Sequence, residues 1–422
     1  MAWPPCWGRV EPEAREGKTY RTHPVVREAL EPLYGHIPAG TIGIHGHLYD
    51  AAAFARRHPG GASLVLAAAG QECTMLFETH HVNHAKALAL LDSLPRVGSY
   101  GEREDEFFDR YRALRARVAP LLRRPVAAGT LLERGAWVVA LGALHAVLCT
   151  RAPGTGAWVA AVLATAAAST VCGGIGHDAL HRGRPLAVLL DWNGLSCFEW
   201  MLEHISSHHM HTNTAFDHDV LSMRPFVEWT PVAVGCVGLV GMHLIFLISE
   251  VAVALQGLFV HRVRWAPWRR GGFPGWLRVA PLLFPLRLAT LMLGQGPLWG
   301  ALSFFVTVAL AGYGFALLAH LNHAPAAYPM SPDDFVLQQL TTTRDIRPFL
   351  PKALMLGLDR QTLHHLFPSV DHSLLDDRLR TEVSRALPPT ERDLLRPRAA
   401  GALYGGMCAA ASRGPRAEPT AR

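Results

Sequence analysis

The sequence predicts a small α+β domain followed by an all-α membrane domain with about four transmembrane helices and a cytosolic helical cap that carries clustered histidines. Half of the 422 residues are hydrophobic and the mean hydropathy is +0.15. This is too apolar for an ordinary soluble protein and too polar for a chain made wholly of spans. Long apolar runs begin only after residue 130, and histidine clusters lie between and after them. A chain with a soluble part and a membrane part explains both observations.

The net charge of +6 and the pI of about 9.1 come from arginines that flank the apolar runs. Such flanks are typical of the cytosolic side of membrane spans, and no aromatic-interleaved basic patch indicates nucleic-acid binding. The seven cysteines are scattered without a CxxC pair, which favours a reducing compartment over a disulfide framework. The N-terminus lacks the basic-then-apolar pattern of a signal peptide, so we expect it to stay in the cytosol.

The first two segments are soluble in character. Residues 1–35 are rich in proline and charge, and we interpret them as a flexible N-terminus. Residues 36–100 predict the small α+β domain. This domain opens with residues 41–49, which alternate like a hairpin with glycine in the turn and are followed by short helical stretches.

The remaining segments are a linker, the membrane domain and a tail. Residues 101–130 are charged and carry apolar residues at helical spacing, which fits a helix on the membrane surface or a plain connector helix. Residues 131–385 form the predicted membrane domain. Residues 386–422 are rich in proline and arginine and predict a loose C-terminal tail.

Apolar runs of the membrane domain occur at about 135–150, 156–172, 231–259, 279–294 and 297–319. The histidine clusters can meet only if all three lie on the same side of the membrane. This requires an even number of membrane crossings between the second and third clusters. Either 231–259 and 297–319 cross and 279–294 is interfacial, or 279–294 and 297–319 cross and 231–259 does not span simply. The basic stretch 261–270 favours the second arrangement. Both give four crossings.

The three clusters are HxxxH, HxxxHH and QxxHH, and their histidines are His177, His181, His204, His208, His209, His364 and His365. Histidine suits a lipid-facing surface poorly and binds transition metals well. Two histidines four residues apart share one face of a helix, so His177 and His181 can reach one metal, and His204 and His208 repeat this spacing. His209 then points to a neighbouring position from which it can reach a second metal. The pattern predicts one polynuclear site with imidazole ligands.

The stretch from Tyr49 to Gly61 ends in His58-Pro-Gly-Gly and resembles the cytochrome b5 family. Gly70, Thr74 and Phe77 match the spacing of that family. The resemblance implies haem b with His58 as one axial ligand and His81 as the other, with the adjacent His80 as the alternative. Two imidazole ligands leave no open iron position, which is typical of electron transfer.

The order of the three clusters behind such a domain resembles the front-end acyl desaturases across residues 41–380. Thr212-Asn213 after the second cluster and Leu366-Phe-Pro368 after the third support it. The resemblance implies two non-haem iron ions, O₂ as co-substrate, an NADH-cytochrome b5 reductase-like electron donor and the endoplasmic reticulum membrane. It also implies insertion of a cis double bond into a long-chain polyunsaturated fatty acid carried on CoA or phospholipid.

The resemblance implies roles for His323 and Asn322, and residue chemistry suggests roles for Gln361 and Asp178. His323 is an eighth candidate metal ligand, Asn322 a candidate contact of metal-bound water and Gln361 a weak ligand or hydrogen-bond donor. Asp178 is expected to orient a ligand histidine, because outer carboxylates commonly do so. The chain departs from the family with Thr-Leu, where Ile-Glu is commoner, between Gln361 and His364.

The main alternatives keep the same architecture. They are a sphingolipid long-chain-base desaturase and a b5-fused fatty acyl hydroxylase; the QxxHH cluster favours a front-end desaturase. A non-enzymatic haem-binding membrane protein or metal transporter is disfavoured, because a transporter would place its polar ligands at the bilayer midplane within broken helices, whereas these clusters lie at the ends of the apolar runs. The clusters leave the position of the new double bond (Δ4, Δ5, Δ6 or Δ8), the chain length and the acyl carrier open.

Overall fold

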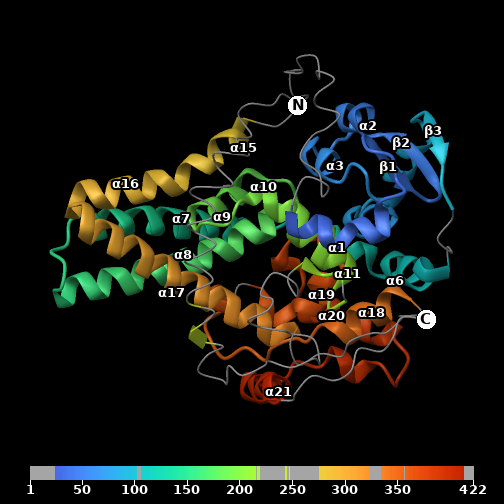
Figure 1. Cartoon of the computed structure of the whole chain (residues 1–422). Helices are drawn as coiled ribbons and strands as arrows, with labels where there is room; N and C mark the ends of the chain where they lie inside the picture. Colours follow the sequence, from blue (N-terminus) through green and yellow to red (C-terminus); the bar gives the residue numbers. More distant parts are fainter. Residues whose placement is uncertain are drawn as a thin grey trace.

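The computed structural model describes residues 24–101, 106–214, 216–218, 243–244, 247, 275–323, 334–355 and 357–412. Within them it shows a small α+β domain beside an all-helical domain (Figure 1). Long helices extend to one side, and shorter helices gather at their ends next to the α+β domain. The predicted fold class is confirmed. The run 231–259 lies outside the described residues except at 243, 244 and 247.

The N-terminal domain is built on a three-stranded antiparallel sheet in the order β1-β2-β3. Its elements are β1 (Thr41–Ile44), β2 (His47–Asp50), α2 (Ala51–Arg57), α3 (Ser63–Ala67), α4 (Thr74–His80), α5 (His84–Asp92) and β3 (Arg96–Ser99). Strands β1 and β2 form the predicted hairpin, in which His45 and Gly46 take positive φ angles of 50° and 77°. Two consecutive positive φ angles suit a tight hairpin turn. Asp50 caps α2 by accepting a hydrogen bond from the backbone N–H of Ala53.

Part of the segment expected to be flexible is a helix, α1 (Pro24–Tyr34). Val26, Leu30 and Tyr34 are buried and pack together with Phe216. Their spacing of four residues places them on one helix face. The expectation rested on composition over the whole segment and missed this short apolar period.

Helix α6 (Glu106–Leu122) carries the predicted helical period and packs inside the protein. Its apolar face contacts α18 (Phe335–Thr342) and α20 (Asp377–Ala386). Tyr111 is 1% exposed, and its hydroxyl donates a hydrogen bond of 2.9 Å to the backbone oxygen of Leu366. Neither expectation for this segment, a membrane-surface helix or a plain connector, describes a helix with a face buried in the core.

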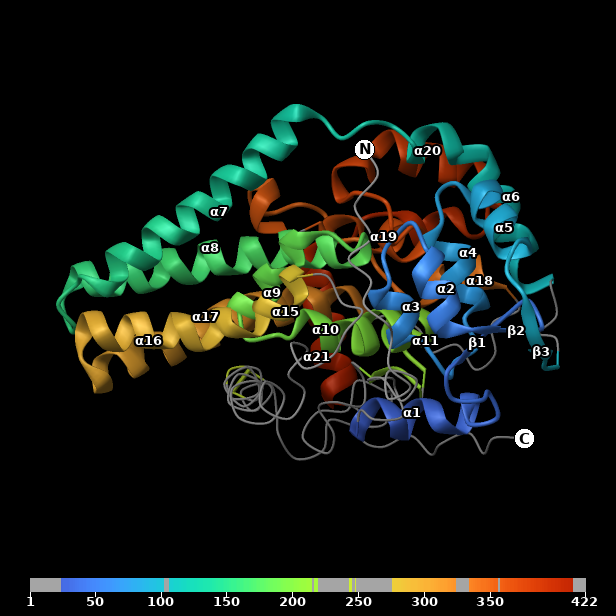
Figure 2. The ribbon, with the colours of Figure 1, turned by 90° about the horizontal axis from the view of Figure 1, so that it is seen from above.

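Four helical segments are long and apolar enough to cross a membrane, and they are α7 (Ala128–Cys149), α8 (Gly156–His181), Gly275–Gln295 and α17 (Pro297–His323). The third consists of α15 (Gly275–Val279), the 3-10 turn η7 (Ala280–Leu282) and α16 (Leu283–Gln295). Helices α7, α8, α16 and α17 run side by side in both views (Figure 2). Four candidate spans indicate a multi-pass membrane protein, and 279–294 and 297–319 are both among them, as the second predicted arrangement requires. The other part of that arrangement, the run 231–259, lies outside the described residues apart from 243, 244 and 247.

Helices α16 and α17 approach closely at Gly300. A Cβ atom there would lie 2.4 Å from backbone atoms of Met292 on α16, so only glycine permits this contact. Large apolar side chains on the outer faces are exposed, for example Leu132, Val139 and Leu293 at 75%, 72% and 86%. A surface of this kind is suited to lipid.

The helices beyond the spans form the predicted cap. They include α9 (Val188–Trp192), α10 (Cys197–Trp200), the π-helix η4 (Met201–His208), α11 (His209–His211), α18, α19 (Gln361–Leu366) and α20. The segment expected to be a loose tail contains the helix α21 (Ala400–Ser412). Leu403 and Met407 of α21 are buried against α17 and its neighbours. This apolar spacing outweighs the proline and arginine content around it.

Candidate metal centre

Helix α8 ends at the first histidine cluster. His177 and His181 lie in its last two turns and are 2% and 4% exposed. Their spacing of four residues places both rings on one face, with ring centroids 5.1 Å apart. The first cluster therefore points from the end of a span into the cap, as expected.

The second cluster lies on η4, whose i→i+5 hydrogen bonds wind it more loosely than an α-helix. With this winding His209, five residues after His204, returns to the same face, and their Nε2 atoms are 3.1 Å apart. His208 points to a different group of ligands. The predicted pairing of His204 with His208 assumed an α-helix and is wrong in this detail.

The third cluster lies on α19, and His323 is the last residue of α17. His364 is completely buried and its ring centroid is 4.7 Å from that of His181. The centroid of His365 is 4.9 Å from that of His323. Segments separated by up to 188 positions in the chain (from residue 177 to residue 365) thus meet at the inner ends of α8 and α17.

The structure brings all eight predicted imidazoles together in two groups, in each of which the ring nitrogens lie within 4.8 Å of one another. The first group is His177, His181, His204, His209 and His364, and the second is His208, His323 and His365. In the first, Nε2 of His177 lies 2.8 Å from Nε2 of His204. Adjacent ligands on one metal at about 2.1 Å would be about 3 Å apart, so this spacing fits a shared ion.

The amide of Gln361 belongs to the second group by position. Its Nε2 atom is 3.1 Å from Nε2 of both His323 and His365. The two amide atoms of glutamine are interchangeable in this assignment, so either can face the group. Three imidazoles and one amide fit a second metal site, and both roles predicted for Gln361 remain compatible with its place.

The Nδ1 atoms of the second group are held by outer partners. His208 donates to Asp217 at 3.0 Å, His365 to Oε1 of Gln339 at 3.1 Å and His323 to the backbone oxygen of Thr342 at 3.2 Å. These hydrogen bonds fix the tautomer that leaves Nε2 free to bind. The second group therefore shows the donor chemistry that metal binding needs.

Burial keeps the ligand candidates neutral. It lowers the pKa of His209, His364 and His365 well below the usual value of 6.5, and neighbouring imidazoles lower it further. A neutral imidazole is the form that binds a metal ion. These imidazoles are therefore available to bind metal cations at neutral pH.

A buried ion-pair network braces the first group. Asp178 and Asp371 each pair with Arg134 and Arg182 at distances between 2.6 and 2.9 Å. The arginines hold the pKa of Asp371 well below its usual range, although burial alone would raise it. Asp178 contacts no ligand ring; it accepts a hydrogen bond of 3.1 Å from the backbone N–H of His372.

His372 is a residue that sequence reasoning missed. Its Nε2 atom lies 3.1 Å from Nδ1 of His364, which leaves the buried Nε2 of His364 to face the first group. A histidine seven positions after the third cluster was the available signal, but no spacing rule singles it out. Asn322, in turn, donates two hydrogen bonds of 2.6 Å to the backbone oxygens of Arg344 and Leu358, and its contact with bound water stays a prediction.

Two other histidines near the second cluster lie outside both groups. His211 makes a hydrogen bond of 2.8 Å with the hydroxyl of Tyr34, and His218 lies 3.8 Å from the carboxylate of Glu203. Each of these two side chains therefore interacts with a residue outside the histidine groups.

The N-terminal domain contains a pair of facing imidazoles that is separate from the two histidine groups. Nε2 of His58 lies 3.5 Å from Nε2 of His81, while their Nδ1 atoms bond to the backbone oxygens of Gly61 and Phe77 at 2.8 Å. Both Nε2 lone pairs therefore point at each other. A metal between two axial ligands separates them by about 4 Å, so the pair fits a haem iron. The ring of His80, the alternative second axial ligand, does not face His58.

Burial lowers the pKa of His58 and lowers that of His81 to about 4. Both rings are neutral at physiological pH, as axial ligation requires. The geometry favours His81 over His80 as the partner of His58.

Comparison with known proteins agrees with this architecture. Residues 153–392, more than half of the chain, match the fatty acid desaturase family, and residues 40–101 match the cytochrome b5-like heme/steroid binding domain. No solved structure matches the chain.

Curated relatives are similar to this chain over most of its length. The acyl-lipid (7-3)-desaturase of Rebecca salina is 27% identical over 77% of this chain and 79% of its own. The acyl-lipid (8-3)-desaturase of Mortierella alpina is 25% identical over 84% and 88%. The cytochrome b5-related protein of Drosophila melanogaster is 28% identical over 79% of each chain. With its buried histidine groups and its haem-type domain, the chain belongs to the fatty acid desaturase family and is an oxidoreductase with a fused N-terminal cytochrome b5 domain.

Proposed function

We propose that this protein is a front-end acyl desaturase that introduces a cis double bond into a long-chain polyunsaturated fatty acid in an O₂-dependent reaction. The observation that carries the proposal is the convergence of eight histidines, in two groups, next to a domain with a facing histidine pair. Relatives named acyl-lipid desaturases favour a lipid-bound acyl chain over acyl-CoA.

We assign two iron ions to the two histidine groups. His177, His181, His204, His209 and His364 would hold one ion; His208, His323 and His365, with Gln361, would hold the other. Iron supplies O₂ activation and hydrogen removal from two adjacent methylenes. The protein's own contribution is a rigid ligand cage, since Asp217, Gln339 and the Thr342 carbonyl fix the imidazole tautomers.

Haem b in the N-terminal domain would be held by His58 and His81. Held by these two imidazoles, the haem would supply electron transfer. An NADH-cytochrome b5 reductase-like protein is the proposed donor. We place the protein in the endoplasmic reticulum membrane, with the N-terminal domain and the cap on the cytosolic side.

A cavity between α7, α8 and the segment before the third cluster suits the approach of the substrate. Its lining is mixed: Trp137 and Ile175 of the spans are apolar, whereas Arg134 and Asp178 of the same helices are charged, as is Lys352 opposite them. The cavity reaches the first histidine group through His372.

The acyl-lipid assignment is tested by expression in yeast supplied with a panel of polyunsaturated acids, followed by mass spectrometry of double-bond positions. A product two hydrogens lighter than the substrate supports desaturation, and a product with an added oxygen supports the hydroxylase alternative. Desaturation of long-chain bases instead of fatty acids would identify the sphingolipid alternative.

The metal assignment is tested by substitution. His181→Ala, His209→Ala and His365→Ala should each abolish product, because each removes an imidazole from a group of ligands. His211→Ala is the matched control, since His211 contacts Tyr34 and lies outside both groups. Full activity in any of the first three variants would refute the assignment.

A further inference from the structure

His80 connects the N-terminal domain directly to the metal centre. Its ring lies nearly parallel to that of His181, with an interplanar angle of 24° and a centroid separation of 5.8 Å. This spacing is typical of offset aromatic stacking. His80 is also bonded through the chain to His81, the residue whose Nε2 atom faces His58. One pair of consecutive residues therefore touches both histidine sites.

A second contact brings the other haem-type loop to the same place. A Cβ atom built on Gly183, two residues after His181, would lie 3.2 Å from the backbone oxygen of Gly60. Gly60 follows His58 in the His-Pro-Gly-Gly turn. Both loops that carry facing histidines thus abut the end of α8.

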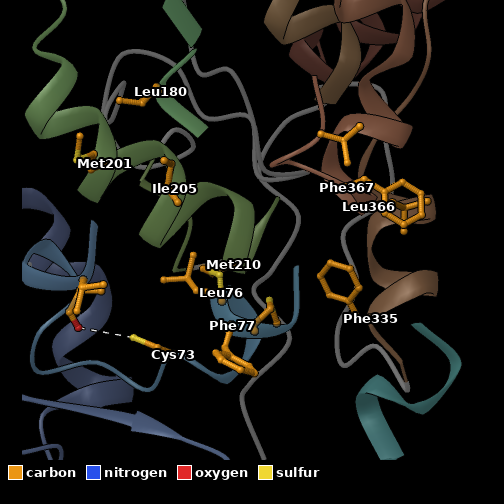
Figure 3. Close-up of a cluster of buried hydrophobic side chains, with 14 of the residues drawn as sticks. Cys73, Leu76, Phe77, Leu180, Met201, Ile205, Met210, Phe335, Leu366 and Phe367 are labelled. Atoms are coloured by element: carbon orange, nitrogen blue, oxygen red, sulfur yellow. Dashed lines mark hydrogen bonds between the residues drawn. The ribbon is translucent and has the colours of Figure 1, made fainter. Parts of the chain in front are cut away.

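The hydrophobic core holds this arrangement in place. Leu76 and Phe77 of α4 belong to the same buried cluster as Ile205 of η4 and Met210 of α11 (Figure 3). Glu78 of α4, which has no exposed surface, pairs with Arg112 and Arg115 of α6 at 2.8 and 3.3 Å. The N-terminal domain is therefore fixed against the cap by packing and by ion pairs, which differs from a domain that swings on a tether.

We propose that His80 is the contact residue through which electrons pass from the haem site to the metal centre. This inference rests on the proposed function, in which His58 and His81 hold haem and His181 holds iron. In each transfer one electron leaves the ferrous haem, which becomes ferric, and one iron of the centre is reduced from ferric to ferrous. The connected atoms run from the ring of His81 through the peptide bond to the ring of His80 and across the stacked contact to His181. His80 acts through its neighbours and is a positioning residue.

The test measures haem oxidation in the purified full-length protein. The protein is reduced with dithionite without oxygen, then mixed with O₂ and acyl substrate while the ferrous haem band is followed by stopped flow. A sample depleted of non-haem iron gives the rate at which O₂ oxidises the haem directly. We expect His80→Ala and His80→Leu to lower the iron-dependent part of the rate by about tenfold or more, as is usual for residues that support a metal ligand. His80→Phe retains a ring face and should recover part of it.

Haem spectrum, haem midpoint potential and iron content separate the possible outcomes. In the His80 variants we expect all three to match the wild type, and His47→Ala on strand β2 serves as the control for a histidine loss in the same domain. An unchanged iron-dependent rate in His80→Ala overturns the inference. Loss of the haem spectrum in both His80→Ala and His80→Phe also overturns it, because His80 would then be an iron ligand. Absence of haem or iron from the wild type would instead contradict the proposed function.

Discussion

At the scale of single residues, the arrangement around His364 shows how a ligand is oriented from outside the metal cluster. His372 approaches Nδ1 of His364, and the backbone of His372 is anchored to Asp178. Asp178 is itself held by Arg134 and Arg182. A histidine whose ring nitrogen is fixed in this way presents its other nitrogen at a defined angle, which raises metal affinity.

We therefore predict that His372→Ala lowers iron affinity by about 10- to 100-fold, because His364 loses its outer partner. The measurement is the iron content of the purified protein and its loss during titration with a chelator. The haem spectrum should not change, because His372 does not contact the N-terminal pair. His211→Ala is the control, and equal iron retention in both variants would contradict the prediction.

Gly357 offers an independent way to move the same ring. Its φ angle is +80°, and an added Cβ would lie 2.3 Å from Nδ1 of His372. Gly357→Ala is therefore expected to destabilise the protein by about 1–3 kcal/mol and to lower its iron content. Gly405→Ala, where a Cβ meets no atom within 4 Å, is the matched control in thermal melts.

At the scale of elements, the π-helix η4 and helix α6 decide how the site is assembled. The i→i+5 winding of η4 divides its three histidines between the two groups, as an α-helix of the same sequence would not. Helix α6 buries one face in the cap and supplies two arginines to Glu78 of α4. It thereby links the N-terminal domain to the segment that follows the third cluster.

The link between α4 and α6 predicts a dependence of stability on pH. Burial alone would raise the pKa of Glu78, but hydrogen bonds from His45, His84 and Arg112 hold it well below the usual value of 4.5. Folding therefore favours the ionised carboxylate. This stabilisation is fully present above pH 4.5 and is lost progressively as the pH falls below that value.

The measurement is thermal unfolding of the wild type and of Glu78→Gln between pH 7 and pH 3. The wild type should lose more stability than the variant across the acidic range, because only the wild type must protonate a paired carboxylate. Glu106→Gln, an exposed position at the start of α6, is the control and should follow the wild type. Parallel curves for Glu78→Gln and the wild type would show that the pair contributes nothing.

At the scale of the whole molecule, one buried hydrophobic cluster extends from the N-terminal domain into the cap (Figure 3). It contains Tyr49 and Phe77 on one side and Leu202 and Phe367 on the other. Domains joined by a shared core unfold together, since neither keeps a complete core without the other. The haem-type domain therefore shares its hydrophobic core with the rest of the folded protein.

We expect haem release, followed by the Soret band, and the loss of tertiary structure, followed by tryptophan fluorescence, to coincide in a thermal melt. Leu76→Ala should lower both midpoints together and cost about 2–5 kcal/mol, because it opens a cavity in the shared cluster. Two separate transitions, with haem lost first, would show that the domain is only loosely docked.

The sequence predicted much of this protein, and the errors have specific causes. Spans, the hairpin and the seven clustered histidines were readable because each depends on residue type and local period, whereas His323 was expected from the family resemblance. The helical period of residues 107–121 was also readable, but the surface that it buries was not, because that surface comes from residues 335–342 and 377–386. The helices at 24–34 and 400–412 were missed because proline and charge dominated their surroundings.

The sequence by itself determined the ligand types, the five apolar runs and the presence of two histidine sites, with two arrangements of the crossings left open. Only the tertiary structure decided which histidines share a group, that His372 holds His364 and that His80 touches His181. The physical reason is that spacing along a chain encodes the faces of one helix at an assumed winding. The winding of η4, and contacts between segments far apart in the chain, depend on how the whole core packs.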